Sequence, residues 1–279
     1  MNEAKASLIP IAARLLFPAR SARWMLPVGA GALAALLLLA QARRNMAAQQ
    51  TGAGGEARAL KSIVRPLLRW ATRRALVGRS RSTFSPEKGR FTRADVDRII
   101  RQLWRSYDEL MPGIPWEPTL GARMSLRLAC ATVAAHRALV EAGVEKEEAV
   151  RLIADVAWIA CGKGAALPGL AARAFARDPV RRLRITTDLV RRFPFNPPGY
   201  VIEDVAAADG AVAFDVRRCP VADYFRSHDL GQLCVGTWCS QDYAFAEIWG
   251  GKLERSRTLA AGDDHCDFRW TVIGSEVSS

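Results

Sequence analysis

A thiol and a carboxylate lie three residues apart near the C-terminus of this 279-residue chain, at Cys239 and Asp242. The surrounding residues, from Leu230 to about Trp249, are predicted to form a helix that ends at Gly250-Gly251. Helical spacing places residues three apart on neighbouring turns of one face, where the carboxylate can accept a proton from the thiol or from an attacking water. The sequence therefore indicates Asp242 as a candidate general base.

This predicted helix belongs to a small module that also contains strands. Two short, partly alternating runs, Tyr200–Ala206 and Ala211–Arg217, are joined across Asp209-Gly210 and indicate a β-hairpin. The other predicted elements are a helix from Cys219-Pro220 towards His228 and two closing strands, Lys252–Ala260 and Cys266–Ile273. Residues 193–279 are therefore expected to form a Cys-containing mixed α/β module with antiparallel strands.

Residues 91–192 are predicted to be helical. An amphipathic stripe follows a Thr92 cap and ends before Pro112-Gly113; its members are Val96, Ile99, Ile100, Leu103, Trp104, Tyr107 and Leu110. Further helices are predicted from Leu120 to Ala142, from Lys146 to about Ala160, and from Arg173 to Arg192. Cys130, His136 and Cys161 lie within these apolar helices, where a lone Cys or His is usually a packed core residue, so they are assigned no chemistry. The expected fold class is α+β.

The positive charge of the chain is concentrated at its N-terminus. The whole sequence holds 40 Lys+Arg against 28 Asp+Glu, and 50% of its residues are hydrophobic, which excludes a disordered or collagen-like protein. Residues 1–90 carry 16 of the basic residues and only three acidic ones, so the remainder is close to neutral. A nucleic-acid-binding domain would carry its basic patch on the folded body, and no nucleic-acid partner is expected.

An uncharged apolar stretch lies between Arg23 and Arg43. Its 19 residues, 24–42, would span roughly 28 Å as a helix, which is close to the hydrocarbon thickness of a bilayer. We expect a single transmembrane helix here after a basic leader of residues 1–23, with the C-terminal domain in the cytoplasm. Two alternatives stay open, a signal peptide cleaved near Ala40-Gln41-Ala42 and a buried soluble helix.

Residues 43–90 are expected to form a basic, flexible linker. Residues 46–57 are small, polar and Gly-rich, as in flexible linkers. Apolar residues recur at helical spacing in 58–81 with arginines on another face, so this segment can lie on an anionic membrane surface or form a solvated helix weakened by Pro66. Membrane lipid is an expected partner.

Four motifs of the C-terminal half resemble those of a bacterial enzyme family. They are Arg218–Pro220, Cys239–Glu247, Leu253–Leu259 and Gly262–Arg269. In order and spacing they are similar to the L-2-amino-thiazoline-4-carboxylic acid hydrolase family, and the final Gly-x3-Cys-Asp-Phe-Arg pattern is the most specific of them. The resemblance extends over residues 91–279, whereas residues 1–90 depart from the usual soluble member.

The resemblance implies a hydrolase that opens a small, carboxylated sulfur–nitrogen ring. Water would add to C2 of 2-amino-thiazoline-4-carboxylate, and the ring would break to give N-carbamoyl-cysteine. With the apolar stretch, this implies an enzyme anchored in a bacterial inner membrane. The sequence does not define the oligomeric state. The alternative is a non-catalytic module that binds a small ligand or senses thiol redox state.

Cys219, Cys239 and Cys266 match the pattern of the family although they lie far apart in the sequence. One role open to them is that of a thiolate nucleophile, which needs a nearby cation or a helix N-terminus to lower its pKa. The candidate cations are Arg218, Arg255 and His265. Together with Asp242, the three thiols and His265 are the candidate catalytic residues.

Two other roles for these cysteines stay open. A zinc site that adds His265 or Asp242 has suitable ligand types, but it lacks the paired CxxC spacing of zinc-binding motifs, and no cofactor is required by the sequence. The thiols can also pack the module or pair in a redox response.

Three residues are candidates for binding a substrate carboxylate. Arg255 and Arg269 offer two parallel donors each, and the Thr258 hydroxyl can add a third contact. The alternative for each arginine is an exposed ion pair with Glu254 or Asp267. The chain has no phosphate-binding loop, no HExxH and no GxSxG, so nucleotide-dependent, zincin and serine-hydrolase functions have no support.

Overall fold

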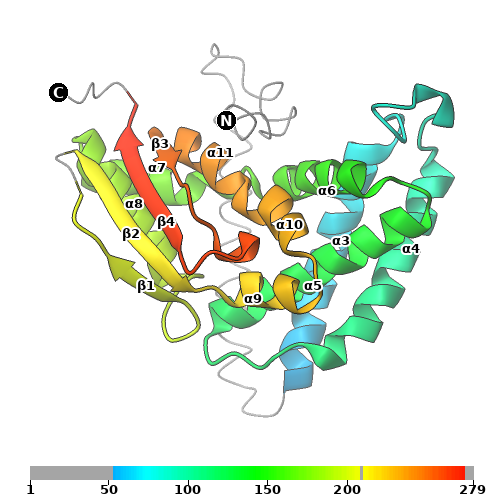
Figure 1. Cartoon of the computed structure of the whole chain (residues 1–279), viewed down its shortest axis with the longest axis horizontal. Helices are drawn as coiled ribbons and strands as arrows, with labels where there is room; N and C mark the ends of the chain where they lie inside the picture. Colours follow the sequence, from blue (N-terminus) through cyan, green and yellow to red (C-terminus); the bar gives the residue numbers. More distant parts are fainter. Residues whose placement is uncertain (1–52, 208–209, 274–279) are drawn as a thin grey trace.

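The computed structural model describes residues 53–207 and 210–273 and shows two parts joined by a central group of short helices (Figure 1). The helices are α3 (Ala53–Leu76), α4 (Arg93–Leu110), α5 (Leu120–Glu141), α6 (Lys146–Cys161), α7 (Ala166–Phe175), α8 (Pro179–Arg192), α9 (Pro220–Ser227), α10 (Gly231–Cys234) and α11 (Gln241–Ile248). Shorter turns are η1 (Pro86–Lys88), η2 (Met111–Gly113), η3 (Val235–Cys239) and η4 (Leu259–Ala261). Helices α3 to α6 form one part, and the sheet with α7 and α8 forms the other.

The sheet has four antiparallel strands in the order β1-β2-β4-β3. Its strands are β1 (Val201–Asp204), β2 (Ala211–Arg218), β3 (Gly251–Glu254) and β4 (Cys266–Val272). Strands β1 and β2 form the predicted hairpin, and β4 pairs with both β2 and β3. The predicted α+β class and the antiparallel strands are confirmed, and β3 is shorter than the predicted strand Lys252–Ala260.

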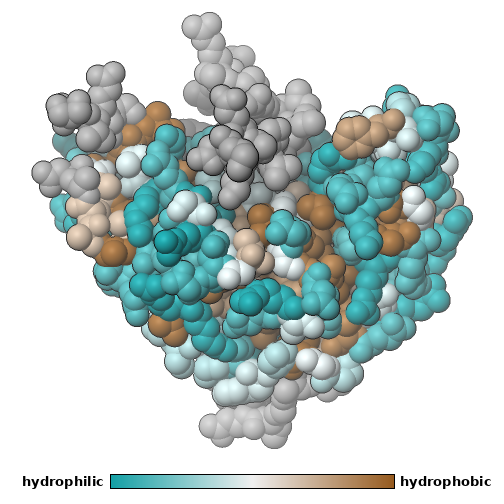
Figure 2. Space-filling view, in the orientation of Figure 1, coloured by the Kyte–Doolittle hydropathy of each residue, from teal (hydrophilic) through white to brown (hydrophobic). Residues whose placement is uncertain are grey.

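The pleat of β2 and β4 separates two chemically different faces. In the register of the two strands, Phe214 lies opposite Phe268 and Asp215 lies opposite Asp267. Because successive side chains point to opposite faces of a strand, the aromatic residues share one face and the charged residues the other. Hydrophilic side chains predominate over the sheet in the view of Figure 2, whereas α8 packs on the reverse side.

Helix α4 confirms the predicted amphipathic stripe and its cap. The Thr92 hydroxyl accepts a hydrogen bond from Asp95 N at 3.2 Å, and the Asp95 carboxylate accepts one from Thr92 N at 3.0 Å. This capping box satisfies N–H groups that the first turn leaves without partners. Six of the seven predicted positions are buried: Val96, Ile99, Ile100, Leu103, Trp104 and Tyr107.

The predicted helix from Arg173 to Arg192 is two helices, α7 and α8. The side chain of Asp178 accepts a hydrogen bond from Arg181 N at 2.6 Å, and Pro179 occupies the first position of α8. An Asp cap followed by Pro favours the start of a helix, because Pro has no N–H to leave unpaired there. The prediction of one continuous helix was therefore wrong at this Asp-Pro step.

Helix α3 occupies much of the segment predicted as a flexible linker, residues 43–90. It packs against α4 and α6, and both Ala71 and Leu76 are buried. Arg73 donates from Nε and Nη2 to the two carboxylate oxygens of Asp97, each at 2.9 Å. From residue 62, where its side chains are described, α3 thus has one apolar face covered by neighbouring helices.

The predicted transmembrane helix, residues 24–42, lies outside the described residues, as does the basic leader 1–23. Within the described ranges, none of the helices combines the length and the apolar character needed to cross a membrane.

Helix α5 contacts the loop before β1 with no room between the two backbones. At Gly121, in the first turn of α5, an added Cβ would lie 2.0 Å from the carbonyl oxygen of Pro194. This close approach holds the 194–200 loop, which borders the cavity described below, against the helical part.

We expect Gly121→Ala to destabilise the fold by about 1–3 kcal/mol, because the backbone of Pro194 must move to admit the methyl group. Urea unfolding followed by circular dichroism measures the change. Gly113→Ala is the matched control, since a Cβ there meets nothing within 4 Å. Equal stability of the two variants would contradict the tight contact.

Candidate active site

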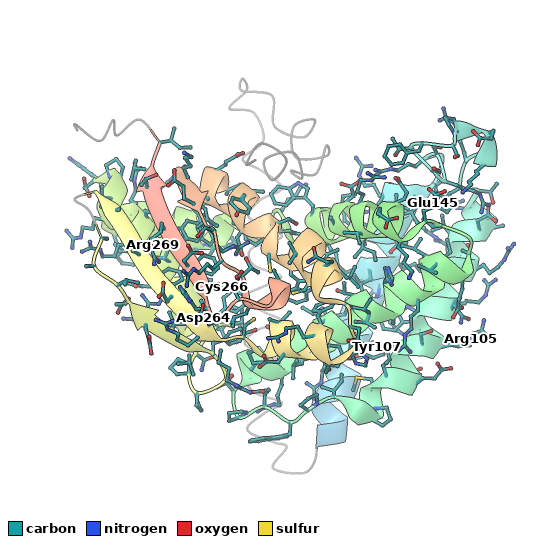
Figure 3. The ribbon with its side chains drawn as sticks, viewed as in Figure 1. Arg105, Tyr107, Glu145, Asp264, Cys266 and Arg269 are labelled. Carbon is teal, nitrogen blue, oxygen red and sulfur yellow. The ribbon has the colours of Figure 1, made fainter. Side chains whose placement is uncertain are left out.

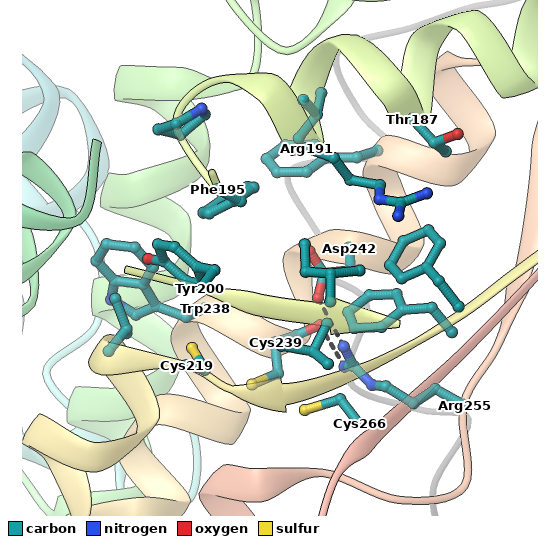
Figure 4. A pocket seen from close by; sticks show the side chains of 18 of the residues that line it. Thr187, Arg191, Phe195, Tyr200, Cys219, Trp238, Cys239, Asp242, Arg255 and Cys266 are labelled. Carbon is teal, nitrogen blue, oxygen red and sulfur yellow. Dashed lines mark hydrogen bonds and ion pairs between the residues drawn. The ribbon is translucent and has the colours of Figure 1, made fainter. Parts of the chain in front are cut away.

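A cavity of about 410 Å³ lies between the inner face of the sheet, α8 and the α10–α11 segment. Cys219, Cys239, Cys266 and Asp242 all line it, so the structure brings together the three predicted thiols and the predicted carboxylate. Figure 4 shows the three sulfur atoms on one side of the cavity, with Thr187 and Arg191 of α8 across from them. We refer to this cavity as the thiol pocket.

A π-helical turn, η3, positions Cys239 at the pocket. Ser240 N donates to Val235 O, five residues earlier, at 3.0 Å, where an α-helix would bond residues four apart. Turns of this kind are frequent at functional sites. The wider turn brings the sulfur atoms of Cys234 and Cys239 to 4.0 Å from each other. A regular helix over Leu230–Trp249, as predicted from the sequence, would not place residues five apart in contact.

Arg255 joins Asp242 to the π-helical turn. Its Nη1 lies 2.6 Å from Asp242 Oδ2, and its Nη2 donates to the carbonyl oxygen of Cys239 at 2.8 Å. Only 3% of the arginine side chain is exposed. Its guanidinium also lies 4.9 Å from the ring centre of Phe268, which adds a cation–π contact. Arg255 is thus the predicted cation that the structure places beside Cys239.

The pKa of the Cys239 thiol is shifted in the direction that favours reactivity. A hydrogen bond from Cys234 and then the positive charge of Arg255 lower its pKa below the ordinary value, and they outweigh the opposing effect of burial. The pKa of Cys234 is raised by the same hydrogen bond and by burial. A lowered pKa increases the thiolate fraction, which is the nucleophilic form. Cys239 is therefore the nucleophile candidate in the thiol pocket.

The other two predicted thiols are held in the neutral form. Burial raises the pKa of Cys266 to about 12, although the backbone N–H of Leu259 donates to its sulfur at 3.2 Å. Burial also raises the pKa of Cys219 well above its ordinary value, despite its position before the first turn of α9. Both thiols line the pocket next to Cys239, but their pKa values are raised whereas that of Cys239 is lowered.

Asp242 combines a raised pKa with a position on the pocket. Burial raises its pKa, and the neighbouring Arg255 only partly offsets this effect. A carboxylate with a raised pKa is a stronger base, and its proton affinity moves towards the range useful for catalysis near neutral pH. Asp242 thus lies at the pocket beside Cys239, and its general-base role stays a prediction.

His265 and Arg269 do not line the thiol pocket. Both contact Asp215 on the opposite face of the sheet: Arg269 Nη2 lies 2.8 Å from Asp215 Oδ1, and His265 Nε2 lies 3.5 Å from Asp215 Oδ2. His265 Nδ1 also pairs with Asp264 at 2.8 Å. Figure 3 labels Asp264 and Arg269 at β4 and the turn that precedes it. His265 was predicted to be catalytic and Arg269 to bind the substrate. In this structure both side chains lie on the face of the sheet opposite the pocket.

Two further predicted residues serve the surrounding structure. Thr258 does not line the pocket, and its backbone N–H donates to Asp263 in the turn before β4. Arg218 pairs with the buried Glu117 at 2.5 Å and also donates to Gly199 O. Arg218 thereby links the end of β2 to the loop before β1. The cation beside Cys239 is Arg255 instead.

The described residues contain no group of three or more His, Cys, Asp or Glu side chains arranged to hold a metal ion. The zinc site considered for Cys219, Cys239 and Cys266 with His265 or Asp242 is therefore not formed in this part of the chain. His265 is directed to the far face of the sheet, and Asp242 is engaged by Arg255.

Several pocket residues were missed by the sequence analysis. Cys234 was assigned no role because its contact with Cys239 depends on the π-helical turn. Arg191, which lies on the wall opposite the thiols, occurs in a stretch with many arginines and nothing to distinguish it. The aromatic residues in 238–249 were the available signal, since Trp238, Phe245 and Trp249 all line the pocket.

Comparison with known proteins identifies a family for most of this region. A family model described as L-2-amino-thiazoline-4-carboxylic acid hydrolase matches residues 124–270, more than half of the chain. All residues that line the thiol pocket fall within this range. No curated protein and no solved structure matches the chain.

The order of thiol pKa values predicts an order of alkylation. Because iodoacetamide reacts with thiolates, we expect modification of Cys239 to rise with pH earlier than that of Cys219, Cys234 or Cys266. Peptide mass spectrometry after short pulses at a series of pH values, each site scaled to its own plateau, measures the four midpoints. A midpoint for Cys239 at or above that of Cys266 would contradict the assignment.

Proposed function

The chain belongs to the L-2-amino-thiazoline-4-carboxylic acid hydrolase family, and on that premise we propose that the thiol pocket hydrolyses a small carboxylated ring containing sulfur and nitrogen. With 2-amino-thiazoline-4-carboxylate as substrate, one water is consumed, the bond between C2 and the ring sulfur breaks, and N-carbamoyl-cysteine is formed. The observation that carries the proposal is a thiol of lowered pKa beside a half-buried carboxylate of raised pKa in one cavity.

In the proposed first step, the Cys239 thiolate attacks C2 of the ring. The bond from C2 to the ring sulfur breaks, and the departing sulfur takes a proton from Asp242, whose pKa is raised by burial. In the second step, Asp242 takes a proton from water as the water attacks C2, and the Cys239 thiolate leaves. Arg255 keeps Asp242 in position through the hydrogen bond from its Nη1, and this contact is an ion pair while Asp242 is ionised.

Arg191 is the proposed contact for the substrate carboxylate. It lines the pocket on the wall opposite Cys239, and its guanidinium lies 4.9 Å from the ring centre of Phe214. Its partner Asp204, at 2.7 Å, is 77% exposed, so this is a surface pair that contributes little stability. A substrate carboxylate can therefore take the place of Asp204. Arg255, predicted for this role, already uses two of its nitrogens within the protein.

The contact between Cys234 and Cys239 supports a second candidate function. Their sulfur atoms lie 4.0 Å apart, and a modest movement would allow a disulfide. The same pocket would then act as a thiol redox or ligand-binding module without turnover. Such a module would depend on its cysteines and would tolerate the loss of Asp242.

Turnover separates these two functions. We expect Cys239→Ser and Asp242→Asn each to lower kcat for 2-amino-thiazoline-4-carboxylate by roughly 10²–10⁴-fold, because each removes a group that acts on the reacting atoms. Mass spectrometry of released N-carbamoyl-cysteine measures the rate. Asp264→Asn, whose side chain is 69% exposed, is the control and should retain activity. Unchanged turnover in Asp242→Asn would overturn the catalytic proposal.

We also propose that residues 24–42 anchor the enzyme in the bacterial inner membrane, with the hydrolase part in the cytoplasm. The support comes from the hydropathy and flanking charges of the sequence. The outer face of α3 is compatible with a nearby bilayer, since exposed Ile63, Leu67 and Trp70 alternate with exposed Arg65 and Arg69.

Membrane attachment predicts that the full chain sediments with membranes and resists alkaline carbonate extraction. We expect Leu36→Arg combined with Leu38→Arg to release it, because each charge at the centre of a spanning helix costs about 2.5–3.5 kcal/mol. Leu8→Arg, in the basic leader, is the control and should stay bound. A soluble wild-type chain would contradict the anchor, and its intact mass would show whether residues 1–42 had been cleaved.

A further inference from the structure

The thiol pocket is larger than a single small ring requires. Its volume of about 410 Å³ falls in the range of roughly 300–1,000 Å³ that holds drug-sized ligands. A 2-amino-thiazoline-4-carboxylate has about nine non-hydrogen atoms, well below the size of such ligands. A substrate that reacts at Cys239 and makes no other contacts would leave much of the pocket unfilled.

The remaining space is bordered by aromatic side chains. Phe195, Tyr200 and Trp238 lie together on one side of the pocket, away from Asp242 and Arg255 (Figure 4). The rings of Phe195 and Tyr200 meet edge to face, with centroids 5.0 Å apart. Edge-to-face contact is a preferred arrangement of aromatic pairs, and both rings line the pocket. We call these three residues the aromatic wall.

Trp238 presents carbon to the pocket and keeps its polar atom outside. Its indole Nε1 donates to the Thr132 hydroxyl of α5 at 3.2 Å. The only hydrogen-bonding group of the side chain is therefore satisfied behind the wall, and a ligand meets the apolar part of the ring. A polar substituent on the substrate would gain no partner from Trp238.

The floor of the pocket, formed by the inner face of the sheet, continues this aromatic surface. Phe214 stacks on Phe268 at 5.1 Å, and Phe268 on Trp270 at 6.0 Å. Arg191 lies over Phe214 and Arg255 over Phe268, so the two cations are held at separate points of one aromatic surface. The polar groups of the pocket are thus placed to contact a reacting ring and its carboxylate. The aromatic wall lies to one side of these groups.

We propose that the natural substrate carries an aromatic group in addition to the carboxylated ring that is opened. The ring would react at Cys239 and Asp242, its carboxylate would bind Arg191, and the aromatic group would pack against Phe195 and Tyr200. This inference rests on the proposed function for the position of the reacting ring, and it extends that function to a larger, arylated class of substrate.

The test compares 2-amino-thiazoline-4-carboxylate with its derivative bearing a benzyl group on the exocyclic nitrogen. Burial of an aromatic ring predicts a kcat/KM at least about tenfold higher for the benzyl compound. A kcat/KM no higher than that of the parent, with the parent hydrolysed, would overturn the inference and leave the proposed function intact.

Neighbouring positions of β1 supply matched variants. Ile202 lines the pocket, whereas Val201 is exposed and does not. We expect Ile202→Trp to remove the preference for the benzyl compound while hydrolysis of the parent continues, and Val201→Trp to leave the preference unchanged. An unchanged preference in Ile202→Trp would overturn the placement of the aromatic group.

Calorimetric binding distinguishes a failure of the proposed function from a failure of this inference. If neither compound is hydrolysed, the proposed function fails. Binding of the benzyl compound at least about tenfold tighter than the parent, weakened by Ile202→Trp and not by Val201→Trp, would still support a pocket for arylated acids. Equal binding of the two compounds would overturn it.

Discussion

The ion pair between the buried Arg255 and the half-buried Asp242 is the interaction on which the pocket depends. It joins the segment after β3 to α11, and through the carbonyl oxygen of Cys239 it also joins the π-helical turn. Removing one partner of such a pair leaves a buried charge uncompensated and typically costs about 3–5 kcal/mol. The pair therefore stabilises the local structure and fixes the carboxylate. The hydrogen bond from Cys234 and then the charge of Arg255 lower the pKa of the Cys239 thiol, whereas the charge of Asp242 opposes them.

Five thiols line the pocket, those of Cys161, Cys219, Cys234, Cys239 and Cys266, and their pKa values differ because their surroundings differ. Cys239 has a thiol donor and a guanidinium nearby, whereas burial dominates for Cys219 and Cys266. In a pocket of low polarity, hydrogen bonds and charges interact more strongly than in water, so the Cys234 thiol and the Arg255 guanidinium together favour the thiolate of Cys239. The neighbouring neutral thiols keep the environment apolar, which is compatible with the aromatic surfaces around them.

Local patterns predicted most of the fold and part of the site. Periodicity and capping defined α4 to α6 closely, and alternation defined β1, β2 and β4. The convergence of Cys219, Cys239, Cys266 and Asp242 on one cavity agreed with expectation. Long-range packing could not be predicted from the sequence. The composition of the linker did not indicate that neighbouring helices cover one side of α3. Arg269 was predicted to face the substrate, but the face on which it lies depends on how β4 pairs with β2. The contact of Cys234 with Cys239 depends on the π-helical turn η3, which no residue type in the sequence predicts.

In β2 and β4, even-numbered and odd-numbered residues lie on opposite faces of the sheet and have different roles. Even-numbered positions, Phe214, Val216, Cys266, Phe268 and Trp270, border the pocket, and odd-numbered ones carry the ionic contacts of the reverse side. Natural variation or a designed library confined to the even positions can therefore reshape what the cavity accepts without disturbing Asp215 and its arginines. A deletion of one residue within β4 would be far more disruptive. It would move the residues on one side of the deletion to the opposite face of the sheet, so that charged side chains would point into the pocket.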